Sequence, residues 1–434
     1  MNIDKLYSYF LKNPKICIDS RKVQKDSIFF ALRGPRYNGN LFAKEALTKG
    51  AKIAVVDQVF EENDDRFFHV SNVLLCLQFL AKKHRKKLHI PVIGITGTNG
   101  KTSTKEFIAL LLSNKFNVAY TKGNLNNHIG VPLTILNINN NHTIAVLEFG
   151  ANKKGDIKEI CEIADPTHGL ITNIGKAHLK DFINIENIVN TKTELWSYLV
   201  KKNGVIFFND DDKILLQKSK VLFNEKIKKN FELYGVDLAK KNDLKLVERS
   251  HLLSIKYHGD LIPTKMTGSY NFINIICAIK VALYFKVKPK NIKKLLPKIS
   301  IKNRSEFIKS KNNEIILDAY NANPNSMSIA IQDFLKIKNY KNEQKVLILG
   351  DMLELGKEEF IEHHKIIQIL EKSNILEKNV FLIGCNFSKT KNQFQKFPTK
   401  EDFFCFLKNA NIKNKLILIK GSRKIELENL IEEL

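Results

Sequence analysis

The chain has 434 residues, which predicts two or three domains rather than a single core. Its 44% hydrophobic and 26% charged residues are typical of a globular protein, and no run is long and apolar enough to insert into a membrane. The net charge of +25 would suit a nucleic-acid partner, but the lysines are scattered along the chain instead of gathered in one patch, so we expect no specific nucleic-acid binding.

The N-terminal segment and the cysteines favour a cytoplasmic protein. Residues 1–15 lack the apolar core and the small-residue cleavage site of a secretory signal. The six cysteines stand far apart, mostly within apolar runs, and form no Cys-x-x-Cys pair. This pattern predicts reduced, buried thiols that do not bind metal.

The first block, residues 1–88, contains two short strand candidates, Ser27–Leu32 and Lys52–Asp57. A helix pattern over Val73–Lys86 follows and ends in the basic run Lys82–Lys87. Cations suit the C-terminus of a helix, so we interpret this run as a solvated helix end.

Apolar runs alternate with helix-like segments through the rest of the chain. This alternation predicts parallel sheets that are covered on both faces. A helix pattern over Ser103–Ser113 follows the first of these runs. The predicted strands are Val92–Thr96, Ile144–Phe149, Gly169–Ile174 and Val205–Phe208 in the second block, and Glu314–Asp318, Val346–Leu349, Val380–Ile383 and Leu416–Ile419 in the third.

The segment Gly94–Thr104 lies where a strand ends and a helix begins. Its glycines let backbone amides approach phosphate oxygens, and the helix start directs unpaired N–H groups at an anion. Lys101 would neutralise the β- and γ-phosphates of ATP, and the Thr102 hydroxyl would ligate magnesium. Position 95, where the general pattern has its first glycine, is isoleucine, and an ordinary glycine turn is the alternative interpretation. The nucleotide-binding residues expected here are Gly97, Thr98, Asn99, Gly100, Lys101, Thr102 and Ser103.

Three further positions carry polar side chains that suit a site. Glu148 ends a predicted strand, and carboxylates at the C-terminal tips of parallel strands lie beside ligand-binding loops and suit magnesium. A helix cap or a surface glutamate is the alternative for this residue. Taken alone, His178 is typical of a structural histidine after a strand, and Lys192 of an exposed helix lysine.

The phrase Thr96–Thr102, T-G-T-N-G-K-T, resembles the phosphate loop of the Mur ligases and the related folylpolyglutamate synthases. Those enzymes join an amino acid or a dipeptide to a carboxylate through an acyl phosphate. Leu147–Ala151 and Ile171–Leu179 also resemble Mur ligase segments. The resemblance implies that Glu148 holds one magnesium ion, that His178 holds a second, and that Lys192 is carbamylated and serves as an anionic ligand.

Further roles follow from the same resemblance. Gly268–Asn274 is similar to a helix start whose asparagines face the nucleotide, with Tyr270 in place of the usual histidine. Arg304 resembles a hinge arginine that domain closure would bring over the phosphates, and Asp318 suits a ribose contact. The implied catalytic residues are Lys101, Lys192, His178 and Arg304; further ATP-binding residues are Asn271, Asn274, Arg304 and Asp318; the magnesium ligands are Thr102, Glu148, His178 and carbamylated Lys192.

Four segments resemble the branch of the family that adds D-alanyl-D-alanine: Gly123–Pro132, Asp318–Met327, Leu349–Gly356 with His363, and Lys420–Arg423 with Glu426. Two more, Asp19–Arg21 and Phe29–Gly34, resemble its uridine-nucleotide region, where Asn38-Gly-Asn40 stands in place of Asp-Gly-His. The resemblance places Ser20, Arg21, Asn126 and Asn127 at the UDP-substrate, and Asn321, Asn323 and Pro324 on the dipeptide side.

The resemblance covers about residues 18–426 and implies an α/β fold of three domains. Residues 1–88 form a small α/β domain that binds the UDP-substrate, 89–300 a central P-loop ATPase-like parallel sheet, and 301–434 a Rossmann-like α/β domain that binds the incoming dipeptide. The implied reaction uses ATP and two magnesium ions to join D-alanyl-D-alanine to UDP-muramoyl-tripeptide in peptidoglycan synthesis, and we expect a monomer. The alternatives are a sister Mur ligase or folylpolyglutamate synthase that adds one amino acid, a basic ATP-dependent nucleic-acid-binding protein, and a non-catalytic scaffold.

Overall fold

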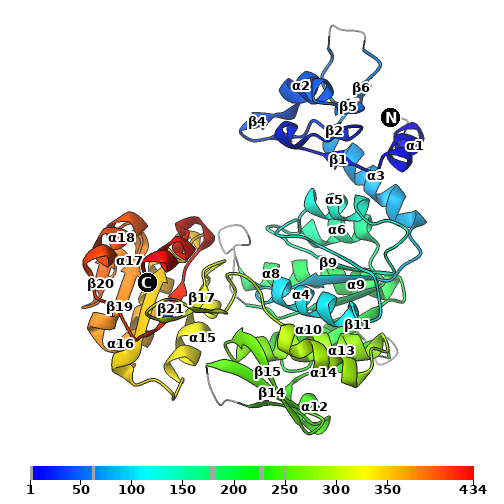
Figure 1. The fold of residues 1–434 in the computed structure, drawn as a ribbon. Helices are drawn as coiled ribbons and strands as arrows, with labels where there is room; N and C mark the ends of the chain where they lie inside the picture. Colours follow the sequence, from blue (N-terminus) through cyan, green and yellow to red (C-terminus); the bar gives the residue numbers. More distant parts are fainter. Residues whose placement is uncertain (1–2, 61–63, 176–181, 183, 224–228, 248–250) are drawn as a thin grey trace. The chain divides into compact units, whose positions relative to one another are not determined.

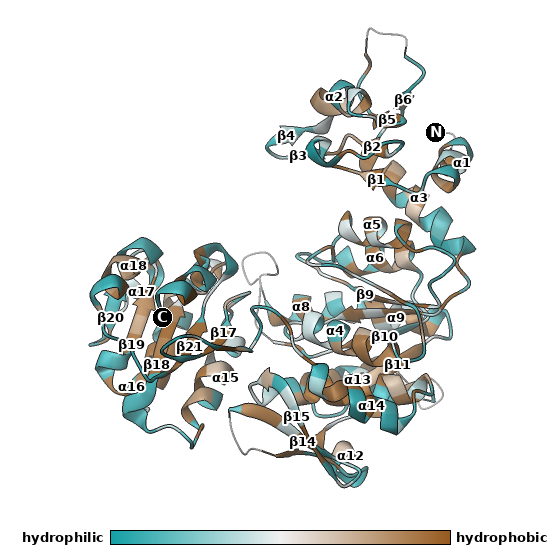
Figure 2. Cartoon of the chain, in the orientation of Figure 1, coloured by the Kyte–Doolittle hydropathy of each residue, from teal (hydrophilic) through white to brown (hydrophobic). Residues whose placement is uncertain are grey.

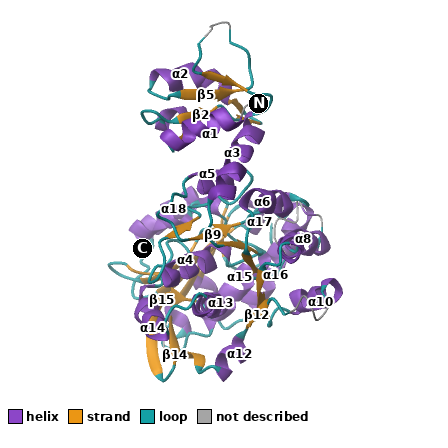
Figure 3. Cartoon of the chain, turned by 90° about the vertical axis from the view of Figure 1, so that its right-hand side faces the viewer, coloured by secondary structure: helices purple, strands orange, loops and turns teal. Residues whose placement is uncertain are grey.

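The computed structural model describes residues 3–60, 64–175, 182, 184–223, 229–247 and 251–434 (Figure 1). The chain divides into two compact units. The first comprises residues 1–96, 116–170 and 191–206, and the second comprises 97–115, 171–190 and 207–434. Both units contain strands and helices (Figure 3).

The N-terminal block forms a four-stranded parallel sheet in the order β1-β2-β5-β6. The two predicted strands are confirmed as β2 and β5, whereas β1, β6 and the β3–β4 hairpin, each of two or three residues, were not predicted. Runs this short carry too little alternation to be read from sequence. The elements are α1 (Ile3–Lys12), β1 (Ile16–Cys17), β2 (Ile28–Phe30), β3 (Arg33–Gly34), β4 (Tyr37–Asn38), α2 (Ala43–Thr48), β5 (Ile53–Val56), β6 (Phe67–His69) and α3 (Val73–Lys87).

The basic run at the end of α3 is only partly a solvated helix end, which corrects the interpretation from sequence. Lys86 and Lys87 are exposed, but Arg85 is 5% and His84 8% exposed. The Arg85 guanidinium donates hydrogen bonds to the carbonyls of Ala164 at 2.8 Å and Leu88 at 2.7 Å. Since a buried guanidinium must have its N–H groups satisfied, Arg85 ties the helix to its surroundings instead of facing solvent.

The central sheet has the strand order β12-β11-β10-β7-β9-β8, and β9 pairs in parallel with both β7 and β8. Every residue of β7 and β9 is buried, so these strands are continuous apolar runs, as predicted. Helix α4 packs against α13 (Figure 3). The elements are β7 (Val92–Thr96), α4 (Lys101–Leu112), β8 (Val118–Tyr120), α5 (Gly130–Leu136), β9 (Ile144–Glu148), α6 (Asp156–Ala164), β10 (His168–Ile171), α8 (Ile185–Lys192), α9 (Glu194–Lys201), β11 (Val205–Asn209), α10 (Lys213–Leu222), β12 (Phe231–Tyr234), α13 (Tyr270–Tyr284) and α14 (Pro289–Leu295).

The second unit contains a nine-stranded mixed sheet in the order β13-β14-β15-β16-β17-β21-β18-β19-β20. The four strands predicted in the third block are confirmed as the parallel neighbours β17, β21, β18 and β19. The antiparallel strands β13 to β16 were not predicted. The elements are α12 (Val236–Lys241), β13 (Leu244–Val247), β14 (Leu252–Tyr257), β15 (Asp260–Thr267), β16 (Glu306–Lys309), β17 (Glu314–Asp318), α15 (Pro324–Leu335), β18 (Lys345–Gly350), α16 (Glu359–Glu371), β19 (Val380–Ile383), α17 (Cys385–Ser388), β20 (Gln395–Phe397), α18 (Lys400–Asn409) and β21 (Leu416–Lys420).

The parallel strands of this sheet bury both faces, which explains their unbroken apolar sequences (Figure 2). Along β21, Leu416 and Leu418 join the core beneath α15 and α16. The alternate residues Ile417 and Ile419 join the core on the opposite face with Phe403 of α18. The two-residue period of a strand therefore divides one apolar run between two cores.

All six cysteines are free thiols, as predicted, but Cys385 and Cys405 are exposed, so the prediction of buried thiols is wrong for these two. Cys385 opens the short helix α17, and Cys405 lies on the outer side of α18. Among the described helices, none combines the length and apolar character that crossing a membrane requires.

Candidate active site

The turn between β7 and α4 contains two glycines that its surroundings require. Gly97 has a φ of +143° and Gly100 a φ of +77°, values that disfavour any side chain. A Cβ atom on Gly97 would lie 1.9 Å from Oγ1 of Thr172, and one on Gly100 would lie 2.7 Å from Oδ1 of Asn274. The backbone of this turn is therefore exposed to close approach by other groups, as a phosphate-binding loop requires.

Residues after β10 hold the turn in place. The amide of Thr98 donates to the carbonyl of Asn173 at 3.0 Å, and the amide of Asn99 donates to Oδ1 of Asn173 at 3.0 Å. The Thr172 hydroxyl donates to the carbonyl of Asn99 at 2.6 Å. The sequence-based prediction placed Thr172 and Asn173 inside the strand Gly169–Ile174 and gave them no role, whereas the observed strand β10 ends at Ile171 and both residues follow it.

Helix α4 begins at Lys101, so the amides of its first turn have no helical acceptor and the positive end of its dipole faces the turn. The Lys101 ammonium folds back and donates to the carbonyls of Gly97 at 2.7 Å and Thr98 at 3.0 Å. Ser103 is 5% exposed. The predicted set from Gly97 to Ser103 thus forms one cationic turn that can accept an anion.

Glu148 is the last residue of β9 and lies opposite Ile95 of β7 in the parallel register. It therefore lies at the C-terminal end of the parallel strands, where β7 leads into the glycine turn. Its side chain is buried, with 2% of its surface exposed, and its Oε1 accepts a hydrogen bond from Nδ2 of Asn126 at 2.8 Å. The alternative of a surface glutamate is wrong. Asn126 thus positions this carboxylate, a contact that the sequence did not predict.

The other predicted nucleotide residues on α13 are buried beside the turn. Asn274 is 6% exposed and its Oδ1 accepts from the Thr104 hydroxyl of α4 at 3.2 Å. Asn271 is 2% exposed and donates to the carbonyl of Thr267 at 2.9 Å. Both side chains therefore help to fix α13 to neighbouring elements.

Arg304 and Asp318 occupy the start of the C-terminal part of the chain. The Arg304 guanidinium stacks on the ring of Tyr320 with 3.7 Å between Cζ and the ring centroid. Oδ2 of Asp318 accepts from Nζ of Lys420 at 2.6 Å, and the side chains of this pair are only 14% and 2% exposed. Lys420 thereby compensates a nearly buried carboxylate.

The remaining predicted metal ligands are less fully described. Lys192 ends α8 and is 5% exposed, so the interpretation as an exposed helix lysine is wrong. His178 lies outside the described residues. Among the described residues, no three His, Cys, Asp or Glu side chains gather as a metal site. Three of the four predicted magnesium ligands, Thr102, Glu148 and Lys192, lie in the described part of the chain.

The residues expected at the UDP-substrate have partners within the protein. Ser20 contacts Glu45, with 3.4 Å between Oγ and Oε2. Arg21 binds Asp19 through two hydrogen bonds of 2.8 Å and holds the pKa of that carboxyl down to about 2. Asn127 accepts from the amide of Gly130 at 2.9 Å, at the start of α5.

The departure from the family pattern at Asn40 leaves a complete local network. Nδ2 of Asn40 donates to Asp57 at 2.8 Å, its Oδ1 accepts from the Asp57 amide at 3.1 Å, and the side chain is 1% exposed. Asn40 therefore fixes the loop after the β3–β4 hairpin to the end of β5.

The residues expected on the dipeptide side form the start of α15. Asn323 caps this helix by accepting from the Ser326 amide at 2.9 Å, and Pro324 occupies the first turn. Nδ2 of Asn323 also donates to Oδ1 of Asn99 in the glycine turn at 2.7 Å. Oδ1 of Asn321 accepts from the next amide at 2.9 Å.

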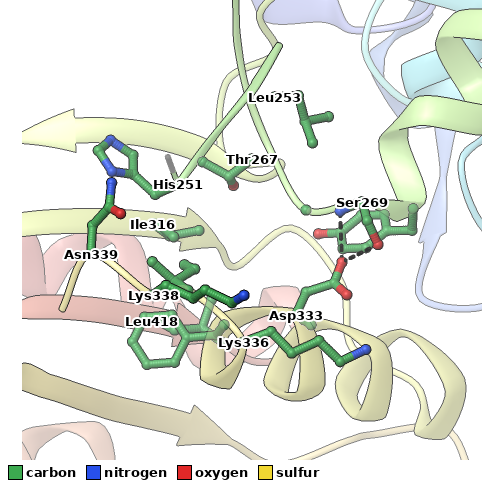
Figure 4. Close-up of a pocket in the computed structure, with 15 residues that line it drawn as sticks. His251, Leu253, Thr267, Ser269, Ile316, Asp333, Lys336, Lys338, Asn339 and Leu418 are labelled. Atoms are coloured by element: carbon green, nitrogen blue, oxygen red, sulfur yellow. Dashed lines mark hydrogen bonds between the residues drawn. The ribbon is translucent and has the colours of Figure 1, made fainter. Parts of the chain in front are cut away.

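A pocket of about 210 Å³ lies beside the first turn of α13 (Figure 4). Its lining includes the apolar side chains of Leu253, Ile316 and Leu418 and the cationic side chains of Lys336 and Lys338. Figure 4 also shows the two hydrogen bonds that join Ser269 to Asp333 across one end of the pocket.

Comparisons with known proteins assign the family. Three family profiles match in chain order: "Mur ligase family, catalytic domain" at residues 15–84, "Mur ligase middle domain" at 95–282, and "Mur ligase, glutamate ligase domain" at 303–423. A UDP-N-acetylmuramoyl-tripeptide--D-alanyl-D-alanine ligase from Bacillus subtilis (strain 168) is 32% identical, over 100% of this chain and 97% of its own. The chain belongs to the Mur ligase family.

This Mur ligase is also similar to solved structures. MurF from Acinetobacter baumannii superposes with a TM-score of 0.83 at 28% identity, covering 97% of this chain and 93% of that one. MurF from Thermotoga maritima, solved in complex with ADP, has a TM-score of 0.81 at 27% identity, covering 96% and 97%. The predicted three-domain α/β fold of a Mur ligase is confirmed.

Proposed function

We propose that this Mur ligase uses ATP to join D-alanyl-D-alanine to the peptide carboxylate of a UDP-N-acetylmuramoyl-tripeptide, in the synthesis of peptidoglycan precursors. The Bacillus relative bears the name of that activity and matches over nearly the full length of both chains, which supports the assignment. The reaction forms a C–N bond and releases ADP and phosphate. Its setting would be the cytoplasm, where the UDP-linked substrate and ATP are available, with the enzyme acting as a monomer.

The observation that carries the proposal is the rigid glycine turn at the N-terminus of α4. Hydrogen bonds with Thr172 and Asn173 fix this turn, and the Lys101 ammonium folds back onto its carbonyls. A turn fixed by such contacts would lose little conformational entropy when the nucleotide arrives. The phosphates of ATP would take over the Lys101 ammonium from the two carbonyls that it now contacts.

The donor set fits magnesium. The ligands would be oxygen atoms and one imidazole, from Thr102, Glu148, His178 and Lys192 as a carbamate. Mg²⁺ prefers oxygen ligands, and the buried carboxylate of Glu148 lies at the C-terminal end of β9. When bound, magnesium supplies positive charge that reduces repulsion between the substrate carboxylate and the γ-phosphate. Asn126 keeps the Glu148 carboxylate in one orientation, and Lys192 is sheltered from solvent at the end of α8.

The catalytic role of the protein is then largely to position and neutralise charge. The carboxylate of the tripeptide attacks the γ-phosphorus and gives an acyl phosphate with release of ADP. The amine of D-alanyl-D-alanine attacks the activated carbonyl, and phosphate leaves. Lys101 and Arg304 would stabilise the transferring phosphoryl group, and well-oriented reactants can gain about 7–11 kcal/mol from positioning alone.

Each domain would contribute one reactant. Residues 1–88, with Ser20 and Arg21, would bind the UDP-substrate, assisted by Asn126 and Asn127. Residues 89–300 would bind ATP through the glycine turn, Asn271 and Asn274, and residues 301–434 would add Asp318 to the nucleotide site. The same C-terminal domain would receive the dipeptide near Asn321, Asn323 and Pro324.

The test is phosphate release by the purified enzyme with ATP, magnesium and UDP-N-acetylmuramoyl-tripeptide. We expect release that depends on D-alanyl-D-alanine, with a ligated product of the corresponding mass. Parallel reactions replace the dipeptide with single amino acids or with DNA. Release that responds to a single amino acid and ignores the dipeptide would point to the single-residue ligases, and stimulation by DNA alone would point to a nucleic-acid-dependent ATPase.

A further inference from the structure

The first turn of α13 is bound to the C-terminal part of the chain at two points. At the first, the carboxylate of Asp333 on α15 accepts from the amide and the hydroxyl of Ser269, at 2.6 and 2.8 Å (Figure 4). A carboxylate at this place also satisfies an N–H group of the helix start and complements the positive end of the helix dipole. These two hydrogen bonds hold Ser269, at the start of α13, against α15.

At the second point, the Tyr270 hydroxyl donates to Oδ2 of Asp318 at 3.2 Å and shares a short hydrogen bond with the hydroxyl of Ser305. Burial, followed by the negative charge of Asp318, raises the pKa of Tyr270 well above its usual value. The phenol therefore stays protonated throughout the working pH range and remains a donor to the carboxylate.

The two known donors to Asp318 converge on one oxygen. Tyr270 and Lys420 both donate to Oδ2, and Lys420 also donates to the carbonyl of Asn321 at 3.2 Å. Within the part of the chain that the structure describes, neither donor uses Oδ1 of Asp318, so this oxygen can accept a hydrogen bond from a ligand. A carboxylate held through one oxygen can present the other to a ligand hydroxyl in a fixed direction.

We propose that Tyr270 is a positioning residue for the nucleotide: its hydroxyl orients Asp318 so that Oδ1 accepts a hydrogen bond from a ribose hydroxyl of ATP. The inference rests on the proposed function, in which Asp318 contacts the ribose. At position 270 it is the tyrosine hydroxyl that makes the polar contacts, with Asp318 and Ser305. Tyr270 also immediately precedes Asn271, so the same contact fixes the start of the helix that carries both asparagines.

The experiment compares Tyr270→Phe with Tyr284→Phe, which removes a hydroxyl from the last residue of the same helix. Binding of ADP with magnesium is measured by calorimetry, together with kcat and KM for each substrate and the midpoint of thermal unfolding. Loss of one hydrogen bond to a charged group predicts about tenfold weaker ADP binding and a raised KM for ATP in Tyr270→Phe. We expect an unchanged KM for D-alanyl-D-alanine and wild-type ADP binding in Tyr284→Phe.

Deoxynucleotides separate positioning from a purely structural role. With 2′-deoxy-ADP and 3′-deoxy-ADP as probes, the difference between wild type and Tyr270→Phe should shrink for the analogue that lacks the hydroxyl bound by Asp318. A difference that persists with both analogues, or a lower unfolding midpoint with unchanged ADP affinity, overturns the inference. Ser305→Ala, which removes the second partner of the Tyr270 hydroxyl, should weaken ADP binding in the same direction.

These outcomes are independent of the test of the proposed function. ADP affinity is measured without acceptor or dipeptide, so it reports on Tyr270 even if the enzyme used another amine. Conversely, wild-type phosphate release that ignores D-alanyl-D-alanine would refute the proposed function and leave the result for Tyr270 intact.

Discussion

Replacing Lys101 by alanine separates the function of the glycine turn from its stability. Within the part of the chain that the structure describes, the Lys101 ammonium donates hydrogen bonds to the carbonyls of Gly97 and Thr98. Each has a net worth of about 1 kcal/mol, so their loss should lower the free energy of unfolding by no more than about 2 kcal/mol. The two carbonyls can then bind water, and the fold should remain intact.

The loss in catalysis should be larger. Hydrogen bonds to charged groups contribute about 1.5–3 kcal/mol each, so two such bonds from Lys101 to the β- and γ-phosphates represent about 3–6 kcal/mol. Because about 1.4 kcal/mol corresponds to a factor of ten, kcat/KM for ATP should fall by about 10²- to 10⁴-fold.

The assay is D-alanyl-D-alanine-dependent phosphate release over a range of ATP concentrations, with urea unfolding on the same preparations. Lys86→Ala, at the exposed end of α3, is the matched control and should behave as wild type in both measurements. A Lys101→Ala enzyme with kcat/KM close to that of wild type would refute the assignment of the turn to the phosphates. Unfolding of the variant under assay conditions would refute the view that the turn is held mainly by Thr172 and Asn173.

Three further outcomes follow from the contacts of single residues. Lys192→Ala should lose activity that added short carboxylic acids partly restore, because they replace the carbamate oxygens; a fully active variant would exclude Lys192 from the mechanism. Lys420→Met should lower the free energy of unfolding in urea by about 3 kcal/mol, since it leaves the Asp318 carboxylate nearly buried without its cation, and adding Asp318→Asn should recover part of the loss. Burial lowers the pKa of His168 from 6.5 to about 4, so the free energy of unfolding is unaffected by this group above pH 6.5 and falls below it, by up to about 3 kcal/mol at pH 4. His168→Gln should therefore flatten the pH dependence of the free energy of unfolding in urea between pH 6.5 and 4. An unchanged slope would contradict this.

Much of the fold was predictable because buried parallel strands carry their signal locally. The runs at Val92–Thr96 and Glu314–Asp318 became strands with the predicted bounds, since the central residues of each are apolar and buried. The antiparallel strands β13 to β15 were missed although burial alternates residue by residue along β14; the pairing of β14 with β15 has a register shift between Leu252 and Ser254. Each of these strands pairs with its neighbour in the chain, so the signal that was missed is a local one.

The candidate site was predictable only in part, for a related physical reason. The glycine turn and Glu148 lie directly at strand ends, where position alone suggests chemistry. The residues that hold them, such as Asn173 and Asn126, are recognisable only once the chain is folded, because each acts through a contact with a separate loop. Arg85 shows the same limit: a basic residue in a cationic run is buried because a carbonyl at the end of α6 accepts its hydrogen bond.

The irregular glycine spacing of the phosphate loop now has a physical explanation. Gly97 is required by the close approach of Thr172, and Gly100 by that of Asn274, so each glycine corresponds to a contact with a different element. Thr172 in turn leads into Asn173, which binds two amides of the same turn. Position 95 lies inside the buried strand β7, where isoleucine packs fully and a glycine would only weaken the sheet. The motif therefore differs from the general pattern because each of its glycines makes room for a neighbour in space, and the phosphate binding that we propose would depend on those neighbours as much as on Lys101.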